Sequence, residues 1–175
     1  MGRGVERTDF SNHRMLLLGG KTHPLLLLRS ILSVLGVTQI IHIDDPRRAI
    51  ELLSMEMFHA IFYDPKTEGH DGMAFPVAAR RKESMLNPLV PIFALQARAR
   101  RHDVEQARDA GVTDVITVPI SPRTLTLKLK AAPRPFIVAQ EFFGPDRRSK
   151  SRPSWWGPDR RTRAARKQKI DFINV

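Results

Sequence analysis

The chain of 175 residues contains no cysteine, which excludes disulfide bonds, thiol catalysis and thiolate metal sites. No apolar run reaches the roughly 18 residues that a membrane-spanning helix needs. Residues 1–13 are polar and lack the apolar core of a signal peptide. We therefore expect a cytoplasmic protein that does not insert into membranes.

Acidic side chains are scarce relative to basic ones, and the imbalance is uneven. The whole chain carries a formal charge of +11, and residues 142–175 contribute +7 of it, with 10 Lys or Arg against 3 Asp or Glu. A basic segment of this kind attracts phosphates, nucleic acids or acidic surfaces. The alternative is a solvated, disordered end that only aids solubility.

Catalytic patterns are also missing. The six histidines do not stand at the spacing of a metal site or a catalytic triad. They are His13, His23, His42, His59, His70 and His102. The sequence therefore predicts a protein that is not an enzyme, with no catalytic residue, no metal and no resident cofactor.

Short apolar runs alternate with amphipathic stretches, which predicts an α/β domain over residues 14–131. We expect strands over 15–18, 38–43, 60–63, 90–95 and 114–118, and helices over 25–35, 46–54, 72–81, 103–110 and 122–131. Five strand–helix units with short loops indicate a doubly wound, five-stranded parallel sheet. Ligands bind beyond the carboxyl ends of such strands, which here carry Gly19-Gly20, Asp64, Gln96 and Val118.

The segments on either side of this domain lack its alternation of apolar runs and amphipathic stretches. Residues 1–13 are predicted to be disordered, and residues 132–175 to form an arginine-rich, ligand-binding extension without apolar periodicity. Within that extension, Phe136-Ile137-Val138 is expected as a short strand or a packing anchor.

A seven-residue pattern occurs twice in the extension, thirteen residues apart: Phe142-Phe143-Gly144-Pro145-Asp146-Arg147-Arg148 and Trp155-Trp156-Gly157-Pro158-Asp159-Arg160-Arg161. Arginine fits the O6/N7 edge of guanine, and aspartate accepts from the N1–H and N2–H₂ donors on the opposite edge. The Trp rings offer stacking faces. We expect each Gly-Pro to form a turn that brings these groups together.

Two such copies predict a ligand with two guanines joined by phosphates, which is cyclic di-GMP. Arg152 and the second arginine of each copy are available for its phosphates. Three simpler explanations stay open: a low-complexity duplication, docking of the Trp pair on the core, and charge balance. RNA or single-stranded DNA binding is a further alternative, although the two aspartates would repel a phosphate backbone.

Residues 14–131 resemble the CheY-like receiver domain of bacterial response regulators. The matching landmarks are Leu35-Gly36, Asp44-Asp45-Pro46, Tyr63-Asp64, Asp71-Gly72, Ala110-Gly111-Val112 and Val118-Pro119. The resemblance implies that the bond before Pro119 is cis and that Asp64 stands where the family accepts a phosphoryl group.

The rest of the family's machinery is absent. Gly19 and Gly20 replace an acidic pair, Gln96 replaces a hydroxyl residue, and Val118 replaces a lysine. A divalent ion needs several oxygen ligands, and a transferred phosphoryl group needs positive charge on its oxygens. We therefore expect Asp64 to be a degenerate phosphoacceptor, with a phosphorylation-dependent response regulator as the alternative.

The domain order resembles the Cle type of CheY-like protein, whose arginine-rich C-terminal extension binds cyclic di-GMP. This resemblance implies that the ligand contacts come from Asp146, Arg147, Arg148, Arg152, Trp155, Trp156, Asp159, Arg160 and Arg161. It also implies a protein partner at the flagellar motor switch and recruitment to the flagellated pole.

Overall fold

A computed structural model describes residues 10–66, 72–81, 85–132, 136–139 and 142–145. Strands and helices alternate along residues 14–131. The strands are β1 Arg14–Leu18, β2 Gln39–Ile43, β3 Ala60–Tyr63, β4 Ile92–Gln96 and β5 Asp114–Thr117. The helices are α1 His23–Val34, α2 Pro46–Met55, α3 Ala74–Arg81, α4 Arg101–Asp109 and α5 Pro122–Ala131.

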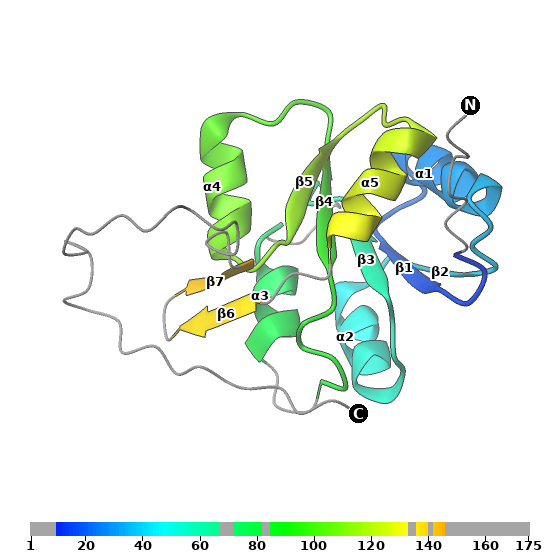
Figure 1. Ribbon diagram of the computed structural model, residues 1–175. Coiled ribbons are helices and arrows are strands. Elements are labelled where there is room, and N and C mark those ends of the chain that lie inside the picture. The colour runs from blue at the N-terminus through cyan, green and yellow to red at the C-terminus, as the bar shows by residue number, and fades with distance from the viewer. Residues whose placement is uncertain (1–9, 67–71, 82–84, 133–135, 140–141, 146–175) are drawn as a thin grey trace, which may run out of the picture.

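The five strands form one parallel sheet in the order β2-β1-β3-β4-β5. Figure 1 shows α1 and α5 on one face of this sheet and α2, α3 and α4 on the other. The predicted doubly wound fold is therefore confirmed. The order reverses between β1 and β3, which places the switch point of the topology beside Asp64.

Successive side chains of the strands point to opposite faces of the sheet and form two separate apolar layers. Leu17, Phe62 and Phe93 point toward α1 and α5, and the rings of Phe62 and Phe93 stack 5.1 Å apart. Their neighbours in the chain, such as Leu16 and Ile61, pack against α2, α3 and α4. Strands buried on both faces read as continuous apolar runs, which explains why they are recognisable in the sequence.

Side-chain caps and glycines mark several helix ends. The Asp45 carboxylate accepts a hydrogen bond from the Arg47 amide at 2.9 Å, and the Ser121 hydroxyl accepts one from the Thr124 amide at 3.1 Å. Gly36 and Gly111 follow α1 and α4 with φ of +90° and +96°. Both conformations favour glycine, which explains why α1 and α4 end at these positions.

The extension begins with a feature that the sequence predicted only in part. Phe136–Ala139 forms strand β6, as expected, and pairs antiparallel with β7, Phe142–Pro145. The prediction of a turn at Gly144-Pro145 is wrong, because both residues lie in β7 and face Ile137 and Phe136 across the hairpin. The β7 backbone lies against α4 (Figure 1).

The packed domain also starts earlier than the predicted boundary at residue 14. Phe10 is 3% exposed and belongs to the layer under α1 and α5. Its carbonyl accepts a hydrogen bond from the His13 amide at 2.9 Å, which closes a turn before β1. Among the residues that the structure describes, no helix is long and apolar enough to cross a membrane.

Candidate functional site

The carboxyl ends of the strands bring the predicted positions together at one edge of the sheet. The Gly19 amide donates to the Ile43 carbonyl at 2.8 Å, and the Asp64 amide donates to the Leu18 carbonyl at 3.0 Å. On the other side, the Val118 amide donates to the Gln96 carbonyl at 3.0 Å. Parallel pairing therefore collects Gly19, Asp64, Gln96 and Val118, as the sequence predicted.

The Asp64 carboxylate is held by hydrogen bonds from neighbouring loops. Its Oδ2 atom accepts from the Thr22 hydroxyl at 3.3 Å, and its Oδ1 atom accepts from the Lys66 amide at 2.9 Å. The side chain is partly buried. Asp64 therefore stabilises the loops that follow β1 and β3 through these two hydrogen bonds.

The loop after β3 approaches itself closely at Gly72. A Cβ atom on Gly72 would lie 2.5 Å from the Pro65 carbonyl oxygen and 2.8 Å from the Pro65 Cβ. Contacts this short require the surrounding atoms to move. Glycine at this position therefore allows the loop to close beside Asp64.

Among the residues that the structure describes, no side chain replaces the acidic pair of a receiver site. Gly19 adopts a φ of +137°, which an L-amino acid with a side chain rarely takes, and its carbonyl accepts from Nε2 of His42 at 2.8 Å. Across the described part of the chain, no three His, Asp or Glu side chains are grouped to hold a metal ion. The donor set thus does not fit the magnesium site that the receiver resemblance implies.

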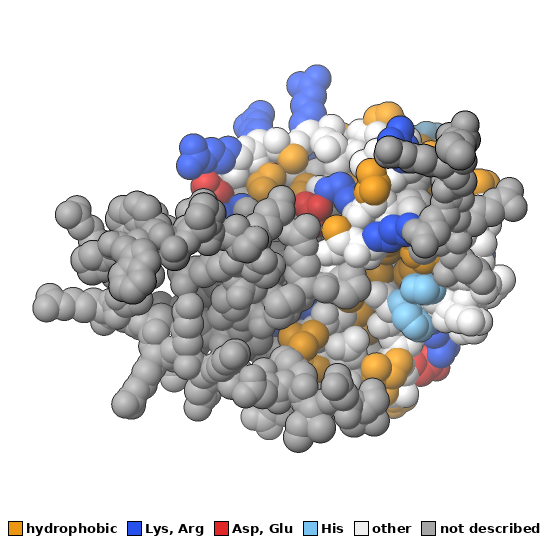
Figure 2. Space-filling view, viewed as in Figure 1, with side chains coloured by type: hydrophobic (Ala, Val, Ile, Leu, Met, Phe, Trp, Pro, Cys, Tyr) orange, Lys and Arg blue, Asp and Glu red, His pale blue; other side chains and the backbone are white. Residues whose placement is uncertain are grey.

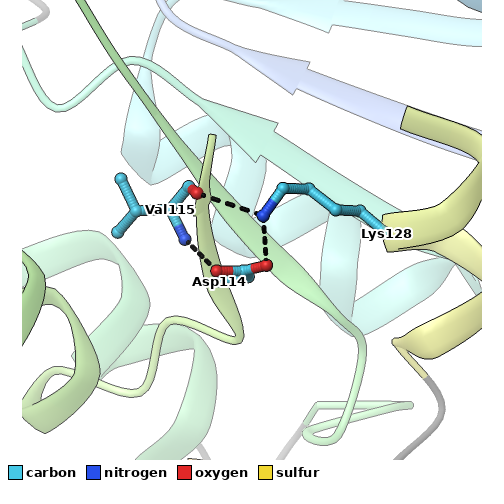
Figure 3. Close-up of polar contacts among 3 residues, drawn as sticks. All are labelled: Asp114, Val115 and Lys128. Carbon is cyan, nitrogen blue, oxygen red and sulfur yellow. Dashed lines mark hydrogen bonds and ion pairs between the residues drawn. The ribbon is translucent and has the colours of Figure 1, made fainter. Parts of the chain in front are cut away.

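The lysine of a receiver site is not supplied from elsewhere on β5 or α5. Val118 follows β5, and its bond to Pro119 is cis, as the resemblance implied. Lys128 on α5 instead pairs with Asp114 at 2.5 Å and with the Val115 carbonyl at 3.4 Å (Figure 3). Asp114 begins β5, at the opposite end of the strand from Val118, so Lys128 is engaged away from Asp64.

An open cleft of about 460 Å³ lies between the loops that follow β3 and β4, a feature that sequence reasoning missed. The residues along it are Pro65, Lys66, Met73, Gln96, Ala97, Arg98, Arg100, Asp103 and Gln106. The sequence signal that could have indicated this cleft is the pair Arg98 and Arg100, which follows the fourth strand. They lie far in sequence from Lys66, so only the fold places the three cations on one cleft.

The predicted ligand contacts lie outside the described residues. These are Asp146, Arg147, Arg148, Arg152, Trp155, Trp156, Asp159, Arg160 and Arg161. The structure describes the start of the first heptad, Phe142–Pro145, as strand β7 beside α4. The heptad assignment therefore stays a prediction.

No protein-family model matches the chain. Two curated sensor proteins align with it: the sensor histidine kinase GacS of Pseudomonas protegens, 31% identical over 114 residues, and GacS of Pseudomonas syringae pv. syringae, 28% identical over 113 residues. Each alignment covers 64% of this chain and 12% of the sensor protein, so the chain spans a small part of these relatives.

Solved structures match the same region. The receiver domain of a sensor histidine kinase from Pseudomonas aeruginosa, with magnesium coordinated in its active-site cleft, gives a TM-score of 0.59 at 24% identity, covering 68% of this chain and 95% of that domain. The chemotaxis response regulator CheY4 of Vibrio cholerae gives 0.58 at 19% identity, covering 69% and 98%. The chain therefore contains a domain with the CheY-like receiver fold.

Proposed function

We propose that this chain is a non-catalytic cyclic di-GMP effector, in which a degenerate receiver carries an arginine-rich nucleotide-binding extension. The observation that carries the proposal is the repeated aromatic-Gly-Pro-Asp-Arg-Arg heptad at 142–148 and 155–161. It follows a receiver fold whose carboxyl edge has Gly19, Gly20 and Val118 where phosphoryl chemistry needs acids and a lysine.

In this proposal each heptad binds one guanine. Asp146 and Asp159 accept from the N1–H and N2–H₂ donors, and Trp155 and Trp156 stack on the bases. One arginine of each pair reads the O6/N7 edge, and the other contacts phosphate, together with Arg152. Tethering makes the second contact intramolecular, so two weak modules give useful affinity.

Isothermal titration of the full chain with cyclic di-GMP tests the proposal. We expect low-micromolar or tighter binding, and a loss of at least about tenfold in Arg148→Ala plus Arg161→Ala, because each arginine makes a charge-assisted contact. Arg163→Ala plus Arg166→Ala is the matched control. It removes the same charge from the same segment outside the heptads, and we expect it to keep its affinity within about twofold.

The control also separates this proposal from binding of RNA or single-stranded DNA. A nucleic-acid site held by general charge predicts similar losses in both double variants, steep salt dependence and little preference for guanine. Equal affinity of the wild type and Arg148→Ala plus Arg161→Ala for cyclic di-GMP would reject the heptads as the site.

The same proposal gives the receiver fold a protein partner. We propose that the loaded extension changes the contact of this domain with the flagellar motor switch, and that the protein is recruited to the flagellated pole. A cell-biological test follows a fluorescent fusion of the full chain. Polar foci that disperse when cellular cyclic di-GMP is removed support the proposal, and foci that ignore the nucleotide oppose it.

One observation favours a second candidate, a phosphorylation-dependent response regulator. Asp64 follows β3 at the switch point of a receiver fold, and a solved receiver domain of this fold holds magnesium in its active-site cleft. The glycines at 19 and 20 and the valine at 118 weigh against this candidate.

A further inference from the structure

The cleft between the loops that follow β3 and β4 carries positive charge that the described residues do not neutralise. Lys66, Arg98 and Arg100 line it with exposed side chains. Within the described ranges, none of these three side chains makes an ion pair. Figure 2 shows Lys and Arg side chains gathered along the edge where, in Figure 1, α4 begins.

The nearby acidic side chains that the structure describes do not cancel this charge. Asp103 lines the cleft, and its carboxylate accepts a hydrogen bond from the Arg100 backbone amide at 3.2 Å, which caps α4. Asp64 is bonded to Thr22 and to the Lys66 backbone, and it does not line the cleft. Among the lining residues that the structure describes, three cations against one carboxylate leave a charge close to +2.

Two polar features of the cleft lie beside this charge. The amide of Gln96 lines the cleft, and its buried Oε1 atom has no hydrogen-bond partner among the described residues. Helix α4 also begins here, and the amides of a helix's first turn favour negative charge. A buried acceptor without a donor is costly, so a hydroxyl group on the organic part of a ligand can stabilise the complex by donating to the Gln96 Oε1 atom.

From this geometry we infer that the cleft between the loops that follow β3 and β4 is a second ligand site, which binds a phosphate monoester of mononucleotide size without covalent chemistry. A phosphate monoester carries about two negative charges at pH 7, which matches the charge of the lining. Arginine forks suit phosphate oxygens. The volume of about 460 Å³ accommodates a small organic body, with Pro65 and Met73 as apolar contacts.

Binding here differs from binding in the extension, because it needs no guanine and uses none of the residues at 146–161. It also differs from phosphorylation of Asp64, because the phosphate stays on the ligand. A site lined by three cations repels Mg²⁺, so binding requires no metal. The inference stands whether or not the extension binds cyclic di-GMP.

Nitrogen–proton NMR of the full chain tests the site with two probes, uridine monophosphate and inorganic phosphate. Uridine lacks the guanine edge, which keeps the extension from dominating the result. We expect both probes to shift the Gln96 side-chain amide and the backbone amides of residues 98–103. We expect Arg98→Gln plus Arg100→Gln to weaken the binding of either probe at least about tenfold.

Arg101→Gln is the matched control, since Arg101 lies next to Arg100 but pairs with Glu105 at 2.8 Å and does not line the cleft. We expect this variant to bind both probes as the wild type does. Tighter binding of uridine monophosphate than of phosphate supports a nucleotide, and equal binding supports a phosphate site alone. Absence of shifts at Gln96, or equal losses in the control and the double variant, overturns the inference.

Discussion

The Thr22 hydroxyl donates to Oδ2 of Asp64 across 3.3 Å, joining the loop before α1 to the end of β3. The second carboxylate oxygen accepts from the Lys66 amide at 2.9 Å. Asp64 thus serves as a local hydrogen-bond acceptor at a carboxyl edge where Gly19 and Gly20 supply no metal ligand. This arrangement predicts that Asp64 does not accept a phosphoryl group.

Incubation with acetyl phosphate and Mg²⁺ should leave Asp64 unmodified, because neither a metal nor a lysine stabilises the transferred phosphoryl group. Intact-mass spectrometry measures the adduct, with Asp64→Asn as the control for labelling elsewhere. A mass increase of one phosphoryl group in the wild type that Asp64→Asn lacks would establish the phosphorylated regulator instead.

Gly72→Ala should destabilise the domain by about 1–3 kcal/mol, because the new methyl group would lie 2.5 Å from the Pro65 carbonyl oxygen. Gly20→Ala is the matched control at the same edge, since a Cβ there meets nothing within 4 Å. Urea denaturation of both variants measures the difference. Equal stability of the two variants would show that the loop after β3 relaxes freely.

Arg80→Met should cost about 3 kcal/mol of folding free energy, because it leaves buried carbonyls without donors. The Arg80 guanidinium donates to the carbonyls of Gly111 at 3.0 Å, Pro88 at 2.6 Å and Val90 at 2.7 Å. Arg101→Met, at an exposed pair with Glu105, should change stability by less than about 0.5 kcal/mol. Similar losses in both would reject the role of Arg80.

The contribution of Arg80 to folding stability should depend on pH with a definite sign. Burial lowers the pKa of Arg80 from its ordinary value to about 9, so the guanidinium is charged in folded and unfolded chains near pH 7. The stability difference between wild type and Arg80→Met should therefore stay constant from about pH 6 to 8. Above pH 9 the unfolded chain binds more protons, so that difference should grow with pH; a decrease would contradict the lowered pKa.

The double variant Asp146→Asn plus Asp159→Asn distinguishes guanine recognition from attraction to phosphate. The two kinds of binding predict changes of opposite sign in the affinity for cyclic di-GMP. Loss of the carboxylates removes acceptors for the guanine N1–H and N2–H₂ donors, which should weaken cyclic di-GMP binding by about tenfold or more. The same change makes the extension more basic, which would strengthen binding driven by charge alone. Isothermal titration decides, and tighter binding would reject guanine recognition.

Most of the fold follows from local rules of residue type and spacing. The strand Ala60–Tyr63 has its predicted bounds, and Asp45 and Ser121 cap their helices by accepting hydrogen bonds from nearby backbone amides. These features depend on neighbours in the chain, so they can be read locally. The turn predicted at Gly144-Pro145 is wrong, because pairing with β6 overrides the local preference of this dipeptide.

The sequence by itself determined the receiver-like order of elements, the loss of acids and lysine around Asp64, and the repeated heptads at 142–148 and 155–161. Each is a matter of residue type and spacing along the chain. Tertiary structure alone decided that Lys66, Arg98 and Arg100 share one cleft and that Lys128 pairs with Asp114. Parallel pairing brings together the ends of β3 and β4, which lie far apart in sequence, and the packing of α5 against the sheet brings Lys128 to Asp114.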